Sequence, residues 1–189
     1  HHPALARLEA LFEHRGEWFI AREYVEGVDF LSWVRPNGKL DEDRLRGAFI
    51  DLVRAVAVLH DAGFAHRDIH PKSVRVAADG RVTLLDFGLV AHLDEVDEGT
   101  SAGAAGTAHY FAPEQIEGGE VHVATDVYAL GVCLYQALLG LLPYDARTHD
   151  GLVQAKRLGR PVPPAVYEPR VPSDLDELCM HMLMRDPSR

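Results

Sequence analysis

The chain has 189 residues, of which 47% are hydrophobic and 25% are charged, and this is typical of a soluble globular domain with one sizeable core. Its 29 acidic and 19 basic residues give a net charge of −10, which would repel a phosphate backbone and disfavours nucleic acid as a partner. Cys133 and Cys179 form no C-x-x-C pair, so the sequence predicts neither a disulfide framework nor a thiolate metal site.

A cytoplasmic location is the expectation. His1-His2-Pro3 is not a basic segment followed by an apolar run, so no signal peptide is predicted. The uncharged stretch from Val127 to Tyr144 is close to the length of a membrane span. Gln136 within it, and Gly140 and Pro143 near its end, favour a helix buried inside a globular body instead.

The first predicted elements are two strands and a short helix. Leu8 to Phe12 and Trp18 to Val25 are rich in strand-forming residues and flank the polar turn His14-Arg15-Gly16, which predicts a hairpin. Phe30 to Val34 then predicts a short helix that ends before Pro36.

A longer amphipathic helix is predicted next, with Asp41 as its N-cap and Gly63 beyond its end. The apolar residues that keep the 3.6-residue period are Leu45, Phe49, Leu52, Val53, Val56 and Leu59. This helix leads directly into the polar stretch that begins at His66.

The stretch from His66 to Gly88 predicts a second hairpin, with Asp79-Gly80 as a two-residue turn that requires positive φ. Its strand residues are Val74, Val76, Val82, Leu84 and Leu85. The hairpin would bring Asp68 and Asp86, at its two ends, toward one point. Two such carboxylates suit phosphoryl transfer, because one can accept a proton from a hydroxyl and the other can hold the Mg²⁺ that bridges nucleotide phosphates.

Three triplets carry a family resemblance. His66-Arg67-Asp68 resembles the catalytic loop of protein kinases, Asp86-Phe87-Gly88 the magnesium-binding triplet, and Ala112-Pro113-Glu114 the end of the activation segment. The resemblance implies an α+β, protein-kinase-like fold that forms a single partial protein kinase domain over residues 1–189. Residues 1–25 would hold the last two strands of the small lobe and the hinge, and residues 26–189 the helical large lobe.

The resemblance also implies roles on the substrate side. Asp68 would be the base that receives the substrate hydroxyl proton, and Arg67 would hold the activation segment. Thr107, in a segment that receives Ser or Thr substrates, would lie near that base. Asp126 would accept hydrogen bonds from the backbone of the catalytic loop.

On the nucleotide side the implied cofactors are ATP and Mg²⁺. The hinge, with Glu23 and Val25, would hydrogen-bond adenine, and Asp86 would be the principal magnesium ligand. Ser73 stands where the family has the asparagine that binds a second metal.

Two further positions differ from the family pattern. His70 replaces the lysine that follows the catalytic aspartate by two residues, and an unperturbed imidazole is mostly neutral at pH 7. Arg22 aligns with the residue at the back of the adenine pocket and would narrow or charge that pocket.

The segment from Leu89 to Tyr110 has no periodicity and predicts an acidic, solvated loop. In the kinase context it is the activation segment. Phosphorylation of Thr100 or Ser101 would then provide a charge for Arg67, or the neighbouring carboxylates would partly occupy Arg67 without phosphorylation.

The C-terminal part predicts a proline-rich connector from Pro161 to Pro172 and a last helix capped by Ser173. The apolar stripe of that helix comprises Leu175, Leu178, Met182 and Leu183.

Two functions remain open from the sequence. The sequences of residues 106–115 and 125–140 resemble those of bacterial Ser/Thr kinases. This resemblance implies transfer of the ATP γ-phosphate to Ser or Thr in a protein substrate. The 189 residues contain no glycine-rich phosphate loop and no strand lysine for the phosphates, so weak or no activity is expected from them alone, and a dimer or an intact kinase partner is an open alternative. The other function is a pseudokinase-type binding module without catalysis.

A zinc site is disfavoured as a third reading. His60, His66 and His70 are spaced H-x₅-H-x₃-H, but Pro71 and the Arg-Asp pair between the last two histidines favour a loop.

Overall fold

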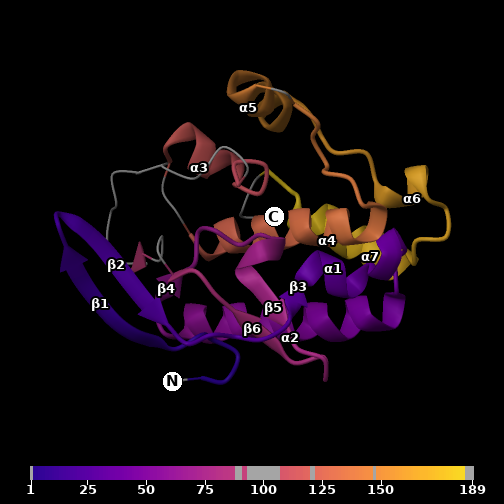
Figure 1. Cartoon of the computed structure of the whole chain (residues 1–189). Helices are drawn as coiled ribbons and strands as arrows, with labels where there is room; N and C mark the ends of the chain where they lie inside the picture. The colour runs from indigo at the N-terminus through magenta and orange to yellow at the C-terminus, as the bar shows by residue number, and fades with distance from the viewer. Residues whose placement is uncertain (1, 88–90, 93–106, 120–121, 147, 186–189) are drawn as a thin grey trace.

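The structure, a computed structural model, describes residues 2–87, 91–92, 107–119, 122–146 and 148–185. Figure 1 shows a body of helices with a two-stranded hairpin at one side. The architecture is α+β, as the sequence predicted. Across the described residues, no helix combines the length and the apolar character that crossing a membrane requires.

The hairpin at the side of the body is formed by β1 (Leu8–His14) and β2 (Glu17–Arg22), which pair antiparallel. Arg15 and Gly16 form the turn, with φ of 55° and 81°, so the predicted polar turn is confirmed. The prediction extended the second strand to Val25, but β2 ends at Arg22. The residues that follow Arg22 therefore connect the hairpin to β3.

A small sheet packs against α1 and α2, with the strand order β3 (Val28–Asp29), β5 (Val74–Val76) and β6 (Val82–Leu84). The predicted hairpin of β5 and β6 is confirmed, but the two-residue turn is wrong. Ala77 N–H donates to the Arg81 carbonyl, and Gly80 N–H donates to the Ala77 carbonyl. Only Gly80 in this loop has positive φ, so Asp79 needs no left-handed conformation.

Helix α2 (Glu42–Asp61) is the long amphipathic helix of the prediction, and the Asp41 side chain caps it by accepting a hydrogen bond from Arg44 N–H. Its buried residues are Leu45, Ala48, Phe49, Leu52, Ala55, Val56 and Leu59. Val53, which the prediction placed in the stripe, is 39% exposed, because the alanines at 48 and 55 share the packed face. Before α2 lie helix α1 (Phe30–Val34), as predicted, and a 3₁₀ turn (Pro36–Gly38).

Helix α4 (Val123–Leu139) forms the centre of the body and is buried on most of its circumference. It begins four residues before the predicted start and ends at Gly140, whose left-handed φ of 75° terminates it. It packs against α7 (Ser173–Met182) at Gly131, where an added Cβ would lie 2.8 Å from Met182 Cβ. This close approach keeps the two helices in contact.

The remaining elements were not predicted. Helix α3 (Pro113–Glu117) follows the described residues 107–112. Helices α5 (His149–Leu158) and α6 (Pro164–Tyr167) come between α4 and α7 in the chain. Strands β4 (Phe64–Ala65) and β7 (Ala91–His92) pair antiparallel.

Two predictions about α7 are wrong. Ser173 is its first helical residue and Pro172 occupies the N-cap position, because proline fits the turn that enters a helix. Leu178 is 42% exposed, and Cys179 is buried in the packed face instead.

Candidate active site

The loop that follows α2 is anchored to α4 through one buried carboxylate. Asp126 has no exposed side-chain surface, and it accepts hydrogen bonds from His66 N–H at 2.7 Å and Arg67 N–H at 2.8 Å. His60 Nε2, at the end of α2, lies 2.8 Å from the same carboxylate. The expected role of Asp126 toward the loop backbone matches these contacts, whereas the contact with His60 was not predicted.

His66 connects this loop to the end of β6. Its Nδ1 accepts from Asp68 N–H at 3.3 Å, so the imidazole carries its proton on Nε2, which donates to the Leu85 carbonyl at 2.8 Å. The ring of Phe87 lies edge-on to it, with centroids 5.5 Å apart. The buried imidazole therefore fixes the distance between the two aspartate-bearing loops.

Both loops contain a strained backbone position. Arg67 has a φ of 70° and Asp86 a φ of 62°, in the left-handed region that residues with a Cβ rarely adopt. Each such residue costs on the order of 1–3 kcal/mol, and it persists only where surrounding contacts hold it. For Arg67 the contact is the hydrogen bond from its N–H to Asp126. For Asp86 it is the bond from His66 Nε2 to the carbonyl of the preceding residue, Leu85.

Asp68 is a partly buried carboxylate with an unsatisfied oxygen. Its Oδ1 is buried and has no hydrogen-bond partner among the residues that the structure describes, and Oδ2 lies 3.9 Å from His70 Nε2. Burial raises the pKa of this carboxyl, the histidines at 70 and 66 lower it, and Asp86 raises it. His66 accepts from Asp68 N–H and donates to the Leu85 carbonyl, so the loop with Asp68 is connected to the residue before Asp86.

His70 and Ser73 hold the loop in shape. Burial lowers the pKa of the His70 imidazole, although Asp68 and Asp86 raise it, which agrees with a neutral ring at pH 7. Ser73 is fully buried, and its hydroxyl donates to the His70 carbonyl at 2.8 Å and accepts from His70 N–H at 3.0 Å. The role of Ser73 as a metal ligand stays a prediction, and these two bonds count against it, because the hydroxyl faces its own loop.

Asp86 has a resident cation. The Arg22 guanidinium, at the end of β2, lies 3.2 Å from Asp86 Oδ1. The carboxylate is a suitable ligand for Mg²⁺, but one oxygen already faces a positive charge and Ser73 adds no second ligand. The residues present therefore fit one ligand of a divalent ion and do not fit the second metal position. The prediction that Arg22 would narrow or charge the adenine pocket stays a prediction, since Arg22 does not line the hollow beside the hinge.

The described residues from Thr107 onward pack beside the loop that contains Asp68. Thr107 begins a turn in which its carbonyl accepts from Tyr110 N–H, and the Tyr110 ring lies 6.0 Å from the His70 ring. Gln115 of α3 donates to the Arg67 carbonyl at 2.8 Å and accepts from Ala112 N–H. These contacts bring the segment with Thr107 to the loop with Asp68. Thr100 and Ser101 lie outside the described residues.

Lys156 is a buried cation that the sequence analysis missed. It projects from α5, is 2% exposed, and donates to the carbonyls of His109 at 2.7 Å and Phe111 at 2.5 Å. A third carbonyl, of Ala108, lies 3.5 Å away, and the Tyr128 ring faces the ammonium at 5.1 Å. Burial lowers the pKa of Lys156 to about 7. Lysine 156 therefore ties α5 to the segment that follows Thr107.

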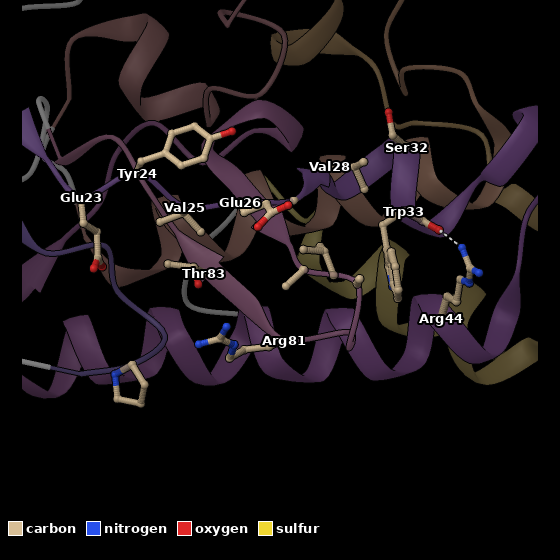
Figure 2. A pocket seen from close by; sticks show the side chains of 15 residues that line it. Glu23, Tyr24, Val25, Glu26, Val28, Ser32, Trp33, Arg44, Arg81 and Thr83 are labelled. Carbon is tan, nitrogen blue, oxygen red and sulfur yellow. Dashed lines mark hydrogen bonds between the residues drawn. The ribbon is translucent and has the colours of Figure 1, made fainter.

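The hinge stretch after β2 borders a hollow of about 980 Å³. Figure 2 shows Glu23, Val25 and Glu26 along one side, with Trp33 and Arg44 at the far end. Glu23 N–H donates to the Arg7 carbonyl, and the Glu23 carboxylate accepts from Arg7 N–H. The backbone of Val25 has no hydrogen-bond partner in the described part of the chain. Neither Asp68 nor Asp86 lines this hollow, so it is not the phosphate end of the site.

Histidines 60, 66 and 70 do not converge. Each contacts a different group, respectively the Asp126 carboxylate, the Leu85 carbonyl and the Lys72 backbone N–H. Over the described residues, no group of three or more His, Cys, Asp or Glu side chains could hold a metal ion. The disfavoured zinc reading therefore receives no support.

The decisive comparison is with protein families. A family model described as "Protein kinase domain" matches residues 1–189. The chain belongs to the protein kinase family. The family that the three triplets suggested is therefore confirmed. The motif roles of the triplets at 66–68, 86–88 and 112–114, and the division of this kinase chain at residue 25, stay predictions.

Curated kinases are similar to this chain over most of its length. A probable serine/threonine-protein kinase of Clostridium perfringens is 29% identical over 169 residues, which are 89% of this chain and 25% of the relative. Serine/threonine-protein kinase RUNKEL of Arabidopsis thaliana is 32% identical over 189 residues, 100% of this chain and 14% of the relative. Serine/threonine-protein kinase PrkC of Bacillus subtilis is 29% identical over 187 residues, 98% and 29%. The chain therefore spans less than a third of each of these relatives.

Proposed function

We propose that this chain carries the substrate side of a serine/threonine protein kinase site, which transfers the γ-phosphate of ATP to Ser or Thr hydroxyl groups of proteins. The observation that carries the proposal is the Asp68 carboxylate, whose buried Oδ1 has no hydrogen-bond partner among the described residues. His66 connects its loop to the Leu85 carbonyl, one residue before Asp86. Kinship with serine/threonine kinases supports the choice of hydroxyl acceptor.

Asp68 is the proton acceptor in this proposal. As the substrate oxygen forms a bond with the γ-phosphorus, its proton passes to the Asp68 carboxylate, the bond to the β-phosphate oxygen breaks, and ADP leaves. Partial burial raises the pKa of Asp68, which makes it a better base than an exposed aspartate. The contacts of Arg67 with Asp126 and Gln115 orient the loop that holds Asp68.

The nucleotide would lie between the hinge and Asp86. The backbone of Val25, which has no hydrogen-bond partner among the described residues, would hydrogen-bond the adenine, with Glu23 beside it in the hinge. A divalent ion would have Asp86 as its one ligand among the described residues, and it would share that carboxylate with Arg22. Both cysteines are free and buried, which fits the cytoplasmic location that we propose for an ATP-dependent enzyme.

Radiolabelled phosphate transfer to a generic basic protein tests the proposal. We expect Asp68→Asn to lower the rate about 100-fold or more, since general-base catalysis contributes about 10²–10⁴ in rate. Asp79→Asn is the matched control, because Asp79 lies in the β5–β6 loop and its side chain is 67% exposed. Equal transfer by the parent chain and Asp68→Asn would show that Asp68 is not the base.

A second candidate is a binding module with a kinase fold and no catalysis. The arginine on Asp86 and the inward hydroxyl of Ser73 favour it, because both reduce the ligands for metal-bound nucleotide. No transfer by the parent chain, together with binding of a protein partner, would favour this candidate over catalysis.

A further inference from the structure

The Arg22 side chain places a permanent positive charge at the acidic end of the site. Its Nη2 lies 3.2 Å from Asp86 Oδ1, and the two side chains are 36% and 43% exposed. Ion pairs with this exposure are weak and open readily. Arg22 can therefore exchange Asp86 for another anion without disturbing the core.

A divalent ion at Asp86 has to compete with this guanidinium. The two cations would share one carboxylate and would repel each other, although solvent weakens this repulsion at an exposed position. Ser73 does not offset the repulsion, because its hydroxyl is held by the His70 backbone. In the described part of the chain, no cluster of three acidic or histidine side chains offers another metal site.

A guanidinium is itself a good ligand for phosphate. Its planar array of N–H donors matches phosphate oxygens, and hydrogen bonds between charged groups are stronger than neutral ones. Arg22 directly precedes the hinge residues Glu23 to Gly27, so a nucleotide that extends from the hinge toward Asp86 passes beside it.

We propose that Arg22 is the resident cation of the nucleotide site: it contacts the nucleotide phosphates in place of a divalent ion, so that ATP binds without one. This inference rests on the proposed function, because it requires nucleotide at the hinge. It also implies that Arg22 weakens the binding of divalent ions to Asp86.

Three variants separate charge from structure. Arg22→Met removes the cation but keeps an unbranched side chain, and Arg22→Lys keeps a charge without the planar donors. Arg7→Met is the matched control, because Arg7 lies beside β1 and its guanidinium pairs with Glu9 at 3.2 Å rather than with Asp86. Circular dichroism of each variant verifies that it is folded.

Fluorescence titration with an ATP analogue that carries a methylanthraniloyl group measures binding in EDTA and in Mg²⁺. We expect the 189-residue chain and Arg7→Met to bind the analogue in EDTA within about threefold of their affinity in Mg²⁺. Arg22→Met should bind it about tenfold or more weakly in EDTA, since a charge-assisted hydrogen bond is lost. Arg22→Lys should lie between the two.

Electron paramagnetic resonance of Mn²⁺ provides a second readout without nucleotide or activity. Mn²⁺ should bind Arg22→Met about three- to tenfold more tightly than the parent chain, because Asp86 is then released from its ion pair. The increase should disappear in the double variant Arg22→Met/Asp86→Asn.

The outcomes distinguish this inference from the proposed function. Binding of the analogue by the parent chain only in Mg²⁺, with no change in Arg22→Met, would overturn the role of Arg22 and leave the proposed function standing. No binding by either protein in either condition would overturn the nucleotide site of the proposed function and this inference with it.

Discussion

The helical body and the β1–β2 hairpin contribute to the same site, but they are packed in opposite ways. In α4 most side chains are buried, whereas every residue of β1 is exposed, and Trp18 and Ile20 of β2 are 70% and 54% exposed. The hairpin lies at the side of the body (Figure 1). It is held there by the backbone bonds of Ala4 and Ala6, just before β1, with Leu84, and by the Arg22–Asp86 pair.

This difference in packing means that Asp68 and the pair of Arg22 and the hinge are held in place in different ways. Asp68 lies on a loop that buried groups fix from several sides, so its position depends on the core. Arg22 and the hinge lie on an element with few contacts to the core, so they can shift when a ligand binds. Substitutions in the two regions should therefore change the free energy of unfolding by different amounts.

The largest effect is expected at Asp126. Asp126→Ala removes the carboxylate that accepts from His66, Arg67 and His60, and it leaves buried donors without a partner. The free energy of unfolding should fall by about 3–5 kcal/mol in urea denaturation. Asp51→Ala on α2, where the side chain is 47% exposed, should change it by less than about 0.5 kcal/mol. Similar losses in both variants would mean that Asp126 does not anchor the loop.

Lys156 should give the protein a distinctive pH dependence. Its pKa is lowered to about 7 in the folded chain from a usual 10.5, so between these values the unfolded state binds more protons than the folded state. The free energy of unfolding of the parent, relative to Lys156→Met, should therefore be constant below pH 7. It should rise between pH 7 and 10.5, by at most about 1.4 kcal/mol per pH unit, and level off above.

Denaturation curves measured across this pH range check the Lys156 prediction. Lys39→Met removes an exposed lysine and should run parallel to the parent at every pH. A constant difference between the parent and Lys156→Met would show that Lys156 keeps its proton when folded.

The contact between α4 and α7 is expected to be intolerant of one methyl group. Gly131→Ala should cost about 1–3 kcal/mol, because the new Cβ meets Met182 and Leu183. Gly47→Ala on α2 is the matched helical glycine with nothing within 4 Å, and it should stabilise the protein by up to about 1 kcal/mol. Thermal unfolding midpoints of the two variants should move in opposite directions.

The smallest effect is expected in the hairpin. Trp18→Ser should change the free energy of unfolding by less than about 0.5 kcal/mol, since this side chain is 70% exposed. Leu134→Ala in α4, where the side chain is fully buried, should cost about 2–5 kcal/mol. A large loss in Trp18→Ser would contradict the contrast between hairpin and body.

Sequence patterns predicted the elements whose order depends on local periodicity. We could predict the apolar stripe of α2, the strands of the two hairpins and the glycine at the end of α4. The aspartates at 68, 86 and 126 were found because fixed triplets and a helix start mark them. The family to which the chain belongs followed from the same triplets.

Features set by distant contacts could not be predicted. In α5 only Leu152 and Lys156 are buried, so no apolar stripe reveals the helix. The burial of Lys156 depends on carbonyls more than 40 residues away in the chain. The pairing of Arg22 with Asp86 likewise depends on the conformation of the long arginine side chain. The alternation of a strand predicts only which face of the sheet a side chain is on.

A carboxyl titration of Asp68 by carbon-detected NMR tests most directly that residues 68 and 86 share one site. The account predicts that the pKa of Asp68 lies above its usual value in the parent chain and falls in Asp86→Asn, because burial and the Asp86 carboxylate both raise it. Asp79→Asn should leave it unchanged. The same pKa for Asp68 in the parent and in Asp86→Asn would contradict a shared site for the two carboxylates.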